Sequence, residues 1–150
     1  MTWRYALISK HSPVTGIAFP VRGIPAPQGS KRHVGGGILI ESSKKVAPWR
    51  DAVRLAAVEE MNGVTPFDGP LELRVTFTLV RPATVKRAMP HVRPDLDKLV
   101  RSTMDALTDA GVWGDDCQVV RIVTAKLYGI YPGADITVSR YSLHGEAVAA

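Results

Sequence analysis

The clearest pattern along the chain is the alternation of apolar and polar residues between positions 71 and 80, LELRVTFTLV. Every second residue from Leu71 to Leu79 is apolar, which is the period of a β-strand with one buried face. A shorter alternation over residues 17–25 contains Pro20, which cannot donate a hydrogen bond to a neighbouring strand. We therefore expect a central strand at 71–80 and an edge strand near 17–25.

Two other segments repeat apolar residues at the three-to-four spacing of an amphipathic helix. The first begins near Lys45 and stops at Asn62 and Gly63, and the second spans about residues 95–109 before Gly111. Each of these helices should bury one face and expose the other.

Three more segments have the composition of strands. Residues 37–41, GILIE, predict a short strand, and residues 117–127 and 134–143 are rich in Val, Ile, Thr and Tyr. The turn-forming sequence YGIYPG between the last two predicts an antiparallel hairpin. Strands and helices in this order predict an α+β fold, with a small mixed or antiparallel sheet carrying two helices.

The length of 150 residues fits one domain with a real core. We expect that domain at residues 17–143, an N-terminal extension of uncertain structure at 1–16 and a flexible tail at 144–150. Trp49 and Trp113 lie in apolar patterns, which favours core or subunit-interface positions.

Cysteine usage and hydropathy limit the class of protein. The single cysteine, Cys117, cannot form a disulfide within the chain, and no Cys/His spacing typical of a metal site is present. No apolar run approaches the roughly 20 residues of a membrane span, and the first residues lack a signal-peptide pattern. We expect a soluble protein of the cytoplasm with no membrane partner, in which Cys117 is a small buried side chain and not a nucleophile.

Positive charge is concentrated in two segments. Lys and Arg total 19 against 14 Asp and Glu, for a net charge of +5. Residues 1–45 carry seven basic residues and one acid, and Arg81 to Arg93 carry four basic residues and no acid. The segment 26–37, APQGSKRHVGGG, predicts a mobile basic loop. This distribution favours a polyanionic partner, although solvated loops without a partner are equally compatible with it.

Aspartates gather at the start of the second helix and just beyond its end. RPDLDKLV contains Asp95 and Asp97, and GVWGDDCQVV contains Asp115 and Asp116. A structural interpretation is available, because Asp95 can cap the helix and Asp97 complements its dipole. The functional alternative is an oxygen-rich site for a hard divalent cation such as Mg²⁺, with the basic segments holding a phosphodiester.

Spacing alone does not bring these carboxylates together. If the helix packs antiparallel to the next strand, Asp115 and Asp116 lie roughly 20 Å from Asp97 at 1.5 Å rise per residue. A joint site then requires the strand to run back past the helix start, or a second subunit.

Residues 93–120, RPDLDKLVRSTMDALTDAGVWGDDCQVV, resemble the signature block of the RusA family of Holliday junction resolvases. GIPAPQGSKRHV and ESSKKVAPWRDAV resemble N-terminal segments of that family, so the similarity covers about residues 17–140. The resemblance implies an intertwined homodimer and a Mg²⁺-dependent endonuclease, with Mn²⁺ as an alternative ion. Such an enzyme makes paired cuts in four-way DNA junctions.

The resemblance also implies residue roles. Asp95, Asp97 and Asp116 would hold the metal ion, with Asp115 as a weaker candidate. Arg101 stands where a catalytic lysine is expected; it keeps the charge and can bind phosphate with two N–H groups, but it cannot donate a proton near neutral pH. The candidate DNA contacts are Lys31, Arg32, Lys86, Arg87, Arg93 and Lys98, the last standing where the family usually has Asn.

Two other functions remain open on the sequence. One is a non-catalytic protein that binds branched DNA and uses its aspartates only structurally. The other is a metal-dependent phosphohydrolase acting on small nucleotides, which the two basic segments make less economical.

Overall fold

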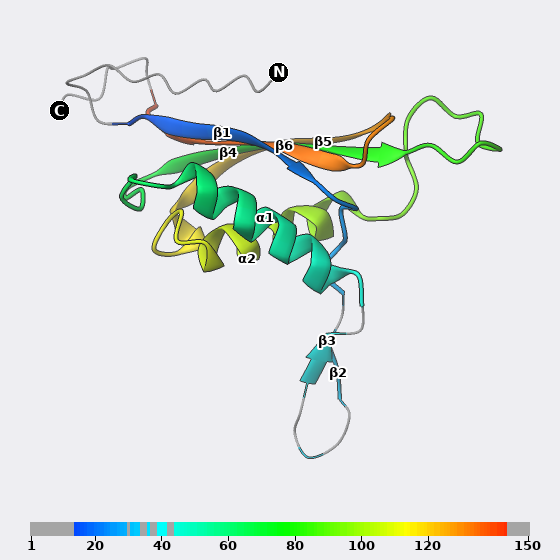
Figure 1. Cartoon of the computed structure of the whole chain (residues 1–150), viewed down its shortest axis with the longest axis horizontal. Helices are drawn as coiled ribbons and strands as arrows, with labels where there is room; N and C mark the ends of the chain where they lie inside the picture. The colour runs from blue at the N-terminus through cyan, green and yellow to red at the C-terminus, as the bar shows by residue number, and fades with distance from the viewer. Residues whose placement is uncertain (1–13, 30, 34–35, 37–38, 42–43, 144–150) are drawn as a thin grey trace.

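A computed structural model describes residues 14–29, 31–33, 36, 39–41 and 44–143, and its main element is a four-stranded sheet (Figure 1). The strands β1 (Gly16–Arg22), β4 (Leu71–Val80), β5 (Val119–Gly129) and β6 (Gly133–Arg140) lie in the order β1-β6-β4-β5. β6 is antiparallel to both β1 and β4, whereas β4 and β5 are parallel. The sheet is therefore mixed, which is one of the two forms, mixed or antiparallel, predicted from the sequence.

Two helices, α1 (Val46–Glu60) and α2 (Leu96–Asp109), lie side by side on one face of this sheet (Figure 1). The apolar residues of β4 predicted to share a face are buried beneath them, from Leu71 to Phe77. Trp49 of α1 packs against Phe77, with ring centroids 6.3 Å apart. The predicted single α+β domain with two helices is confirmed.

Two tryptophans of the core donate hydrogen bonds to threonines of α2. Trp49 Nε1 lies 3.2 Å from Thr103 Oγ1, and Trp113 Nε1 lies 2.8 Å from Thr108 Oγ1. Each threonine hydroxyl in turn donates to the backbone carbonyl one turn earlier in α2. Trp49 and Trp113 are 1% and 2% exposed, which confirms their predicted core positions. These bonds fix α2 against α1 on one side and against the segment that follows α2 on the other.

The prediction that the last two strands pair as a hairpin is wrong. β5 pairs with β4 alone among the described strands, and β6 lies on the other side of β4. β4 is buried over most of its length, so its backbone groups need a strand partner at each edge. The residues between β5 and β6 therefore pass the end of β4, and the local turn sequence could not reveal this.

A separate two-stranded sheet projects from the body of the domain (Figure 1). It pairs β2 (Lys31–His33) with β3 (Leu39–Glu41). The strand predicted at 37–41 is thus present as β3, whereas β2 falls in the segment predicted as a loop. β1 lies at the sheet edge, as the proline in it predicted.

The strands of the main sheet run from residue 16 to residue 140. Most of the predicted extension and all of the predicted tail lie outside the described residues. Within the described part of the chain, neither helix has the length and apolarity needed to cross a membrane.

The two Trp–Thr pairs predict unequal costs for the same substitution. Thr103→Val keeps the side-chain shape but leaves the Trp49 N–H without its acceptor in the fully buried core, so we expect the free energy of unfolding to fall by about 1–3 kcal/mol. Thr108 is half-buried and lines a pocket that water can enter, so Thr108→Val should cost less than about 1 kcal/mol. Urea denaturation of both variants checks this, and equal costs would contradict it.

Candidate functional site

Charged residues form a row along the exposed side of α2. Asp97, Arg101, Asp105 and Asp109 recur every four residues, so they share one side of the helix. The opposite side, which includes Leu99 and other apolar residues, is buried. The row links the two ends of α2, where the predicted carboxylates lie.

At the start of α2, Asp95 occupies the N-cap position in an extended conformation. Its side chain makes no capping hydrogen bond and instead forms an ion pair with Lys98 Nζ at 3.1 Å. Asp97 follows in the first turn and is exposed. The structural interpretation of Asp95 is therefore right about its position and wrong about its bond, and both carboxylates face solvent at the positive end of the helix dipole.

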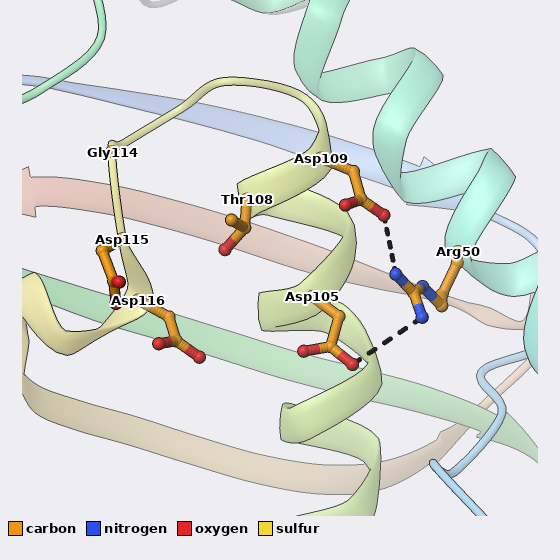
Figure 2. A pocket seen from close by; sticks show the side chains of 7 residues that line it. All are labelled: Arg50, Asp105, Thr108, Asp109, Gly114, Asp115 and Asp116. Atoms are coloured by element: carbon orange, nitrogen blue, oxygen red, sulfur yellow. Dashed lines mark hydrogen bonds and ion pairs between the residues drawn. The ribbon is translucent and has the colours of Figure 1, made fainter. Parts of the chain in front are cut away.

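At the other end of α2 lies an open pocket of about 200 Å³ (Figure 2). It is formed by α1, by the last turns of α2 and by the turn before β5. Its lining residues are Arg50, Asp105, Thr108, Asp109, Gly114, Asp115 and Asp116.

Arg50 of α1 is the cation of this pocket. Its Nη2 lies 2.6 Å from Asp109 Oδ2, and its Nη1 lies 3.7 Å from Asp105 Oδ2, as the dashed lines in Figure 2 show. One guanidinium thus bridges two carboxylates that are one helical turn apart, which also ties α1 to α2.

Asp105 is the carboxyl group of the pocket whose pKa is raised by its surroundings. Burial raises the pKa of Asp105 above its usual value, and the charges of Asp116 and Asp109 raise it further, while Arg50 and Arg101 oppose this rise. The raised pKa shows that Arg50 does not offset all of the burial and negative charge around this carboxyl. Asp116 lines the same pocket as Asp105, and its carboxylate points toward Asp105 in Figure 2.

Asp115 has a structural role in the turn before β5. Its Oδ1 accepts a hydrogen bond of 2.8 Å from the Cys117 backbone N–H, and the Gln118 side chain accepts one from the Asp115 N–H. Together they form a capping box for the 3₁₀ turn η1 (Asp116–Gln118). Hydrogen bonding to the Cys117 backbone N–H lowers the pKa of Asp115.

Cys117 is exposed, so the prediction that it is buried is wrong. The reason is that η1 lies on the surface before the strand begins, and not within it. Its hydrogen bond with Asp115 raises the pKa of the thiol, which favours the neutral form over a nucleophilic thiolate.

The predicted metal-binding residues form two groups in a single chain. Asp95 and Asp97 lie at the start of α2, whereas Asp116 lies beside Asp105 toward its end. In the described ranges, no three His, Cys, Asp or Glu side chains are placed to hold one metal ion. Mg²⁺ prefers carboxylate oxygens as ligands, so the chemistry of these exposed side chains fits the ion. Because they lie in two separate groups, a joint site would need another segment or a second subunit to bring them together.

The predicted DNA contacts have different surroundings. Lys86 and Arg93 are exposed in the connection 81–95, while Arg87 Nε donates a 3.0 Å hydrogen bond to Tyr128 Oη. Lys98 is paired with Asp95. Lys31 and Arg32 belong to β2, but their side chains lie outside what the structure describes.

Sequence reasoning missed Arg50 and Asp109. The period of four from Asp97 onward could have revealed Asp109 as part of the charged row. No local signal identifies Arg50, because its partners are 55 and 59 residues away and meet it only when α1 packs on α2.

Comparison with known proteins gives one family. The family model described as "Endodeoxyribonuclease RusA" matches residues 20–139, about four fifths of the chain. The match runs from β1 to β6 and includes α2 with both groups of aspartates. No curated protein is significantly similar to the chain.

The raised pKa of Asp105 predicts a pH-dependent effect of its neutralisation. Because the folded-state pKa lies above the unfolded value of about 3.8, ionised Asp105 costs stability above its folded pKa and costs nothing once protonated at low pH. Asp105→Asn should therefore raise the melting temperature at pH 7, and this gain should shrink as the pH falls through the folded pKa.

A matched control is Asp109→Asn, which removes the exposed ion pair with Arg50. It should leave the melting temperature at pH 7 unchanged or slightly lower. Thermal melts of both variants from pH 3 to pH 8 check this. A gain for Asp105→Asn that is constant across that range would contradict the explanation.

Proposed function

The chain belongs to the RusA family of endodeoxyribonucleases, and we propose that it resolves four-way DNA junctions as a homodimer, by paired Mg²⁺-dependent hydrolysis of phosphodiester bonds. The family identifies a nuclease of the Holliday junction resolvase type. The observation that carries the finer proposal is the position of the two groups of aspartates relative to the edge of β5 that no described strand covers.

Asp95, Asp97 and Asp116 are the residues that would hold the metal ion. A bound Mg²⁺ supplies charge neutralisation at the scissile phosphate and lowers the pKa of a bound water. Arg101 lies between the two carboxylate groups on the exposed row of α2, where its guanidinium can donate two hydrogen bonds to a phosphate. Asp115 supports Asp116 by fixing the turn.

β5 presents an edge suited to a second copy of the chain. Among the described strands it pairs with β4 alone, it contains no proline, and it exposes Val120, Ile122, Val123 and Leu127. Since neighbouring residues of a strand point to opposite faces, Ile122 and Val123 leave apolar surface on both sides of the sheet. An exposed apolar edge strand is a template for another strand.

Antiparallel pairing of two β5 edges would bring the separated aspartates together. Asp116 lies three residues before β5 begins, at one end of the strand. Near the other end, Lys126 contacts the carbonyl oxygen of Pro94, the residue before Asp95. In an antiparallel pair, the first end of one strand lies beside the second end of the other. Asp116 of each copy would thus approach Asp95 and Asp97 of the other.

The basic segments lie where they would hold DNA beside this site. The hairpin β2–β3 and the connection 81–95 both leave the domain at the end where α2 begins (Figure 1). We assign phosphate contacts to Lys31, Arg32, Lys86, Arg87, Arg93 and Lys98. Such contacts position the protein on DNA without reading its sequence and make its affinity steeply dependent on salt.

Asp97→Asn tests the site. The substitution removes a metal-binding charge from a surface that faces phosphates, so a labelled four-way junction should be bound at least as tightly as by the parent. Cleavage with Mg²⁺ should fall by more than about 100-fold. Gel-shift assays without Mg²⁺ and single-turnover cleavage with Mg²⁺ measure the two quantities. Cleavage at the parental rate would eliminate Asp97, and a parent that binds but never cuts would favour an architectural DNA-binding protein.

Subunit mixing tests whether the site is shared between two chains. Asp97→Asn and Asp116→Asn should each be inactive alone. In a mixed dimer, both substitutions fall in one shared site and leave the other intact, so co-refolded protein should nick one strand of the junction. Asp97→Asn mixed with Asp95→Asn is the matched control. It should stay inactive, because each of the two sites in that mixed dimer then carries one substitution. Failure of the first mixture to regain nicking would place all three aspartates in one chain.

A further inference from the structure

The connection between β4 and α2, residues 81–95, is long for a segment without helix or strand. Connections of this length are usually either functional or loosely held. This one carries the basic residues discussed above and ends at Asp95, so its attachment to the sheet determines where α2 begins.

Two side chains of β5 attach this connection. Lys126 Nζ donates hydrogen bonds of 2.6 Å to the Val92 carbonyl oxygen and 2.7 Å to the Pro94 carbonyl oxygen. Tyr128 accepts the hydrogen bond from Arg87 Nε, farther from α2. Lys126 and Tyr128 are two residues apart in one strand and so share a face. The Lys126 bonds are charge-assisted and therefore stronger than ordinary backbone contacts.

The Lys126 contacts lie directly before the acidic pair. Pro94 is followed by Asp95, whose own carbonyl oxygen accepts the hydrogen bond of Leu99 N–H in the first turn of α2. On the other side, the backbone N–H of Gln28 donates to the Lys98 carbonyl oxygen at 2.9 Å. The start of α2 is thus held between β5 and the segment that leads from β1 to β2.

We propose that Lys126 is a positioning residue that orients Asp95 and Asp97 for metal binding. The proposal rests on the proposed function of those two carboxylates. An ammonium group has three N–H donors, and two of them already bind carbonyl oxygens, so Lys126 is better suited to fix the backbone than to contact DNA. Lys126 touches neither metal nor substrate and acts through Pro94 and Asp95.

Three variants separate this role from others. Lys126→Met removes both hydrogen bonds and keeps the length of the side chain. Lys126→Arg keeps the charge and can restore donation to the carbonyl oxygens. Tyr128→Phe removes only the Arg87 attachment and controls for general loosening of residues 81–95. Thermal melts and sedimentation verify that each variant is folded and associates like the parent.

For Lys126→Met we expect junction cleavage to fall by roughly 10- to 100-fold, the size typical of losing support behind a metal ligand. The Mg²⁺ concentration for half-maximal cleavage should rise, while junction affinity without metal and its salt dependence should not change. Lys126→Arg should recover most of the activity, and Tyr128→Phe should behave like the parent.

Amide hydrogen exchange without metal or DNA gives a readout that does not depend on cleavage. The amides of Leu99, which donates to the Asp95 carbonyl oxygen, and of Gln28, which donates to the Lys98 carbonyl oxygen, should exchange faster in Lys126→Met than in Tyr128→Phe. Parental exchange and parental cleavage in Lys126→Met would overturn the proposal. The proposal would also be overturned by a lower junction affinity whose salt dependence is reduced by about one counterion, because this result would identify Lys126 as a phosphate contact. If the parent cuts no junction, the proposed function fails and the catalytic part of this inference fails with it, whereas faster exchange would still establish the Lys126 attachment.

Discussion

Repulsion between carboxylates is the constraint on which the arrangement of this domain depends. α2 and the turn after it carry aspartates at short intervals, and like charges brought close together raise one another's pKa. Of the six aspartates from Asp95 to Asp116, three have a cationic partner: Asp95 pairs with Lys98, and Asp105 and Asp109 pair with Arg50. These ion pairs offset part of the repulsion between the aspartates of α2. The raised pKa of Asp105 marks the position where the repulsion and burial are not fully offset.

The orientation of α2 follows from the sheet and decides which acids can meet. Because β4 and β5 are parallel, the chain must return along α2, so α2 starts near the end of β5 and finishes near its beginning. Within one chain this separates Asp97 from Asp116. For two chains paired through antiparallel β5 edges, the same geometry has the opposite effect. The parallel pairing of β4 and β5 thus explains why Asp97 and Asp116 lie apart in one chain. It also explains why antiparallel pairing of two β5 edges would bring them together.

Local pattern predicted the elements well, because burial of one face imposes a period that a short segment reveals. Residues 71–80 and both helices lie within a residue or two of the predicted limits. Strand pairings and side-chain contacts between residues far apart in the sequence could not be predicted in this way. The turn before β6 resembles a hairpin turn, but β4 needed neighbours on both edges. Arg50 and Lys126 likewise gain their roles only when α1 packs on α2 and β5 lies beside the start of α2.

Symmetry gives the divided site a chemical advantage in the proposed dimer. Antiparallel pairing of two identical edges is isologous, so one contact creates two equivalent sites. Resolution of a four-way junction requires two cuts, and two sites formed by one assembly step are present together whenever either is present. A lone chain carries Asp95 and Asp97 without Asp116 beside them, so it would lack a complete site and would not nick DNA. The separation of the aspartates along α2 would then couple cleavage to assembly.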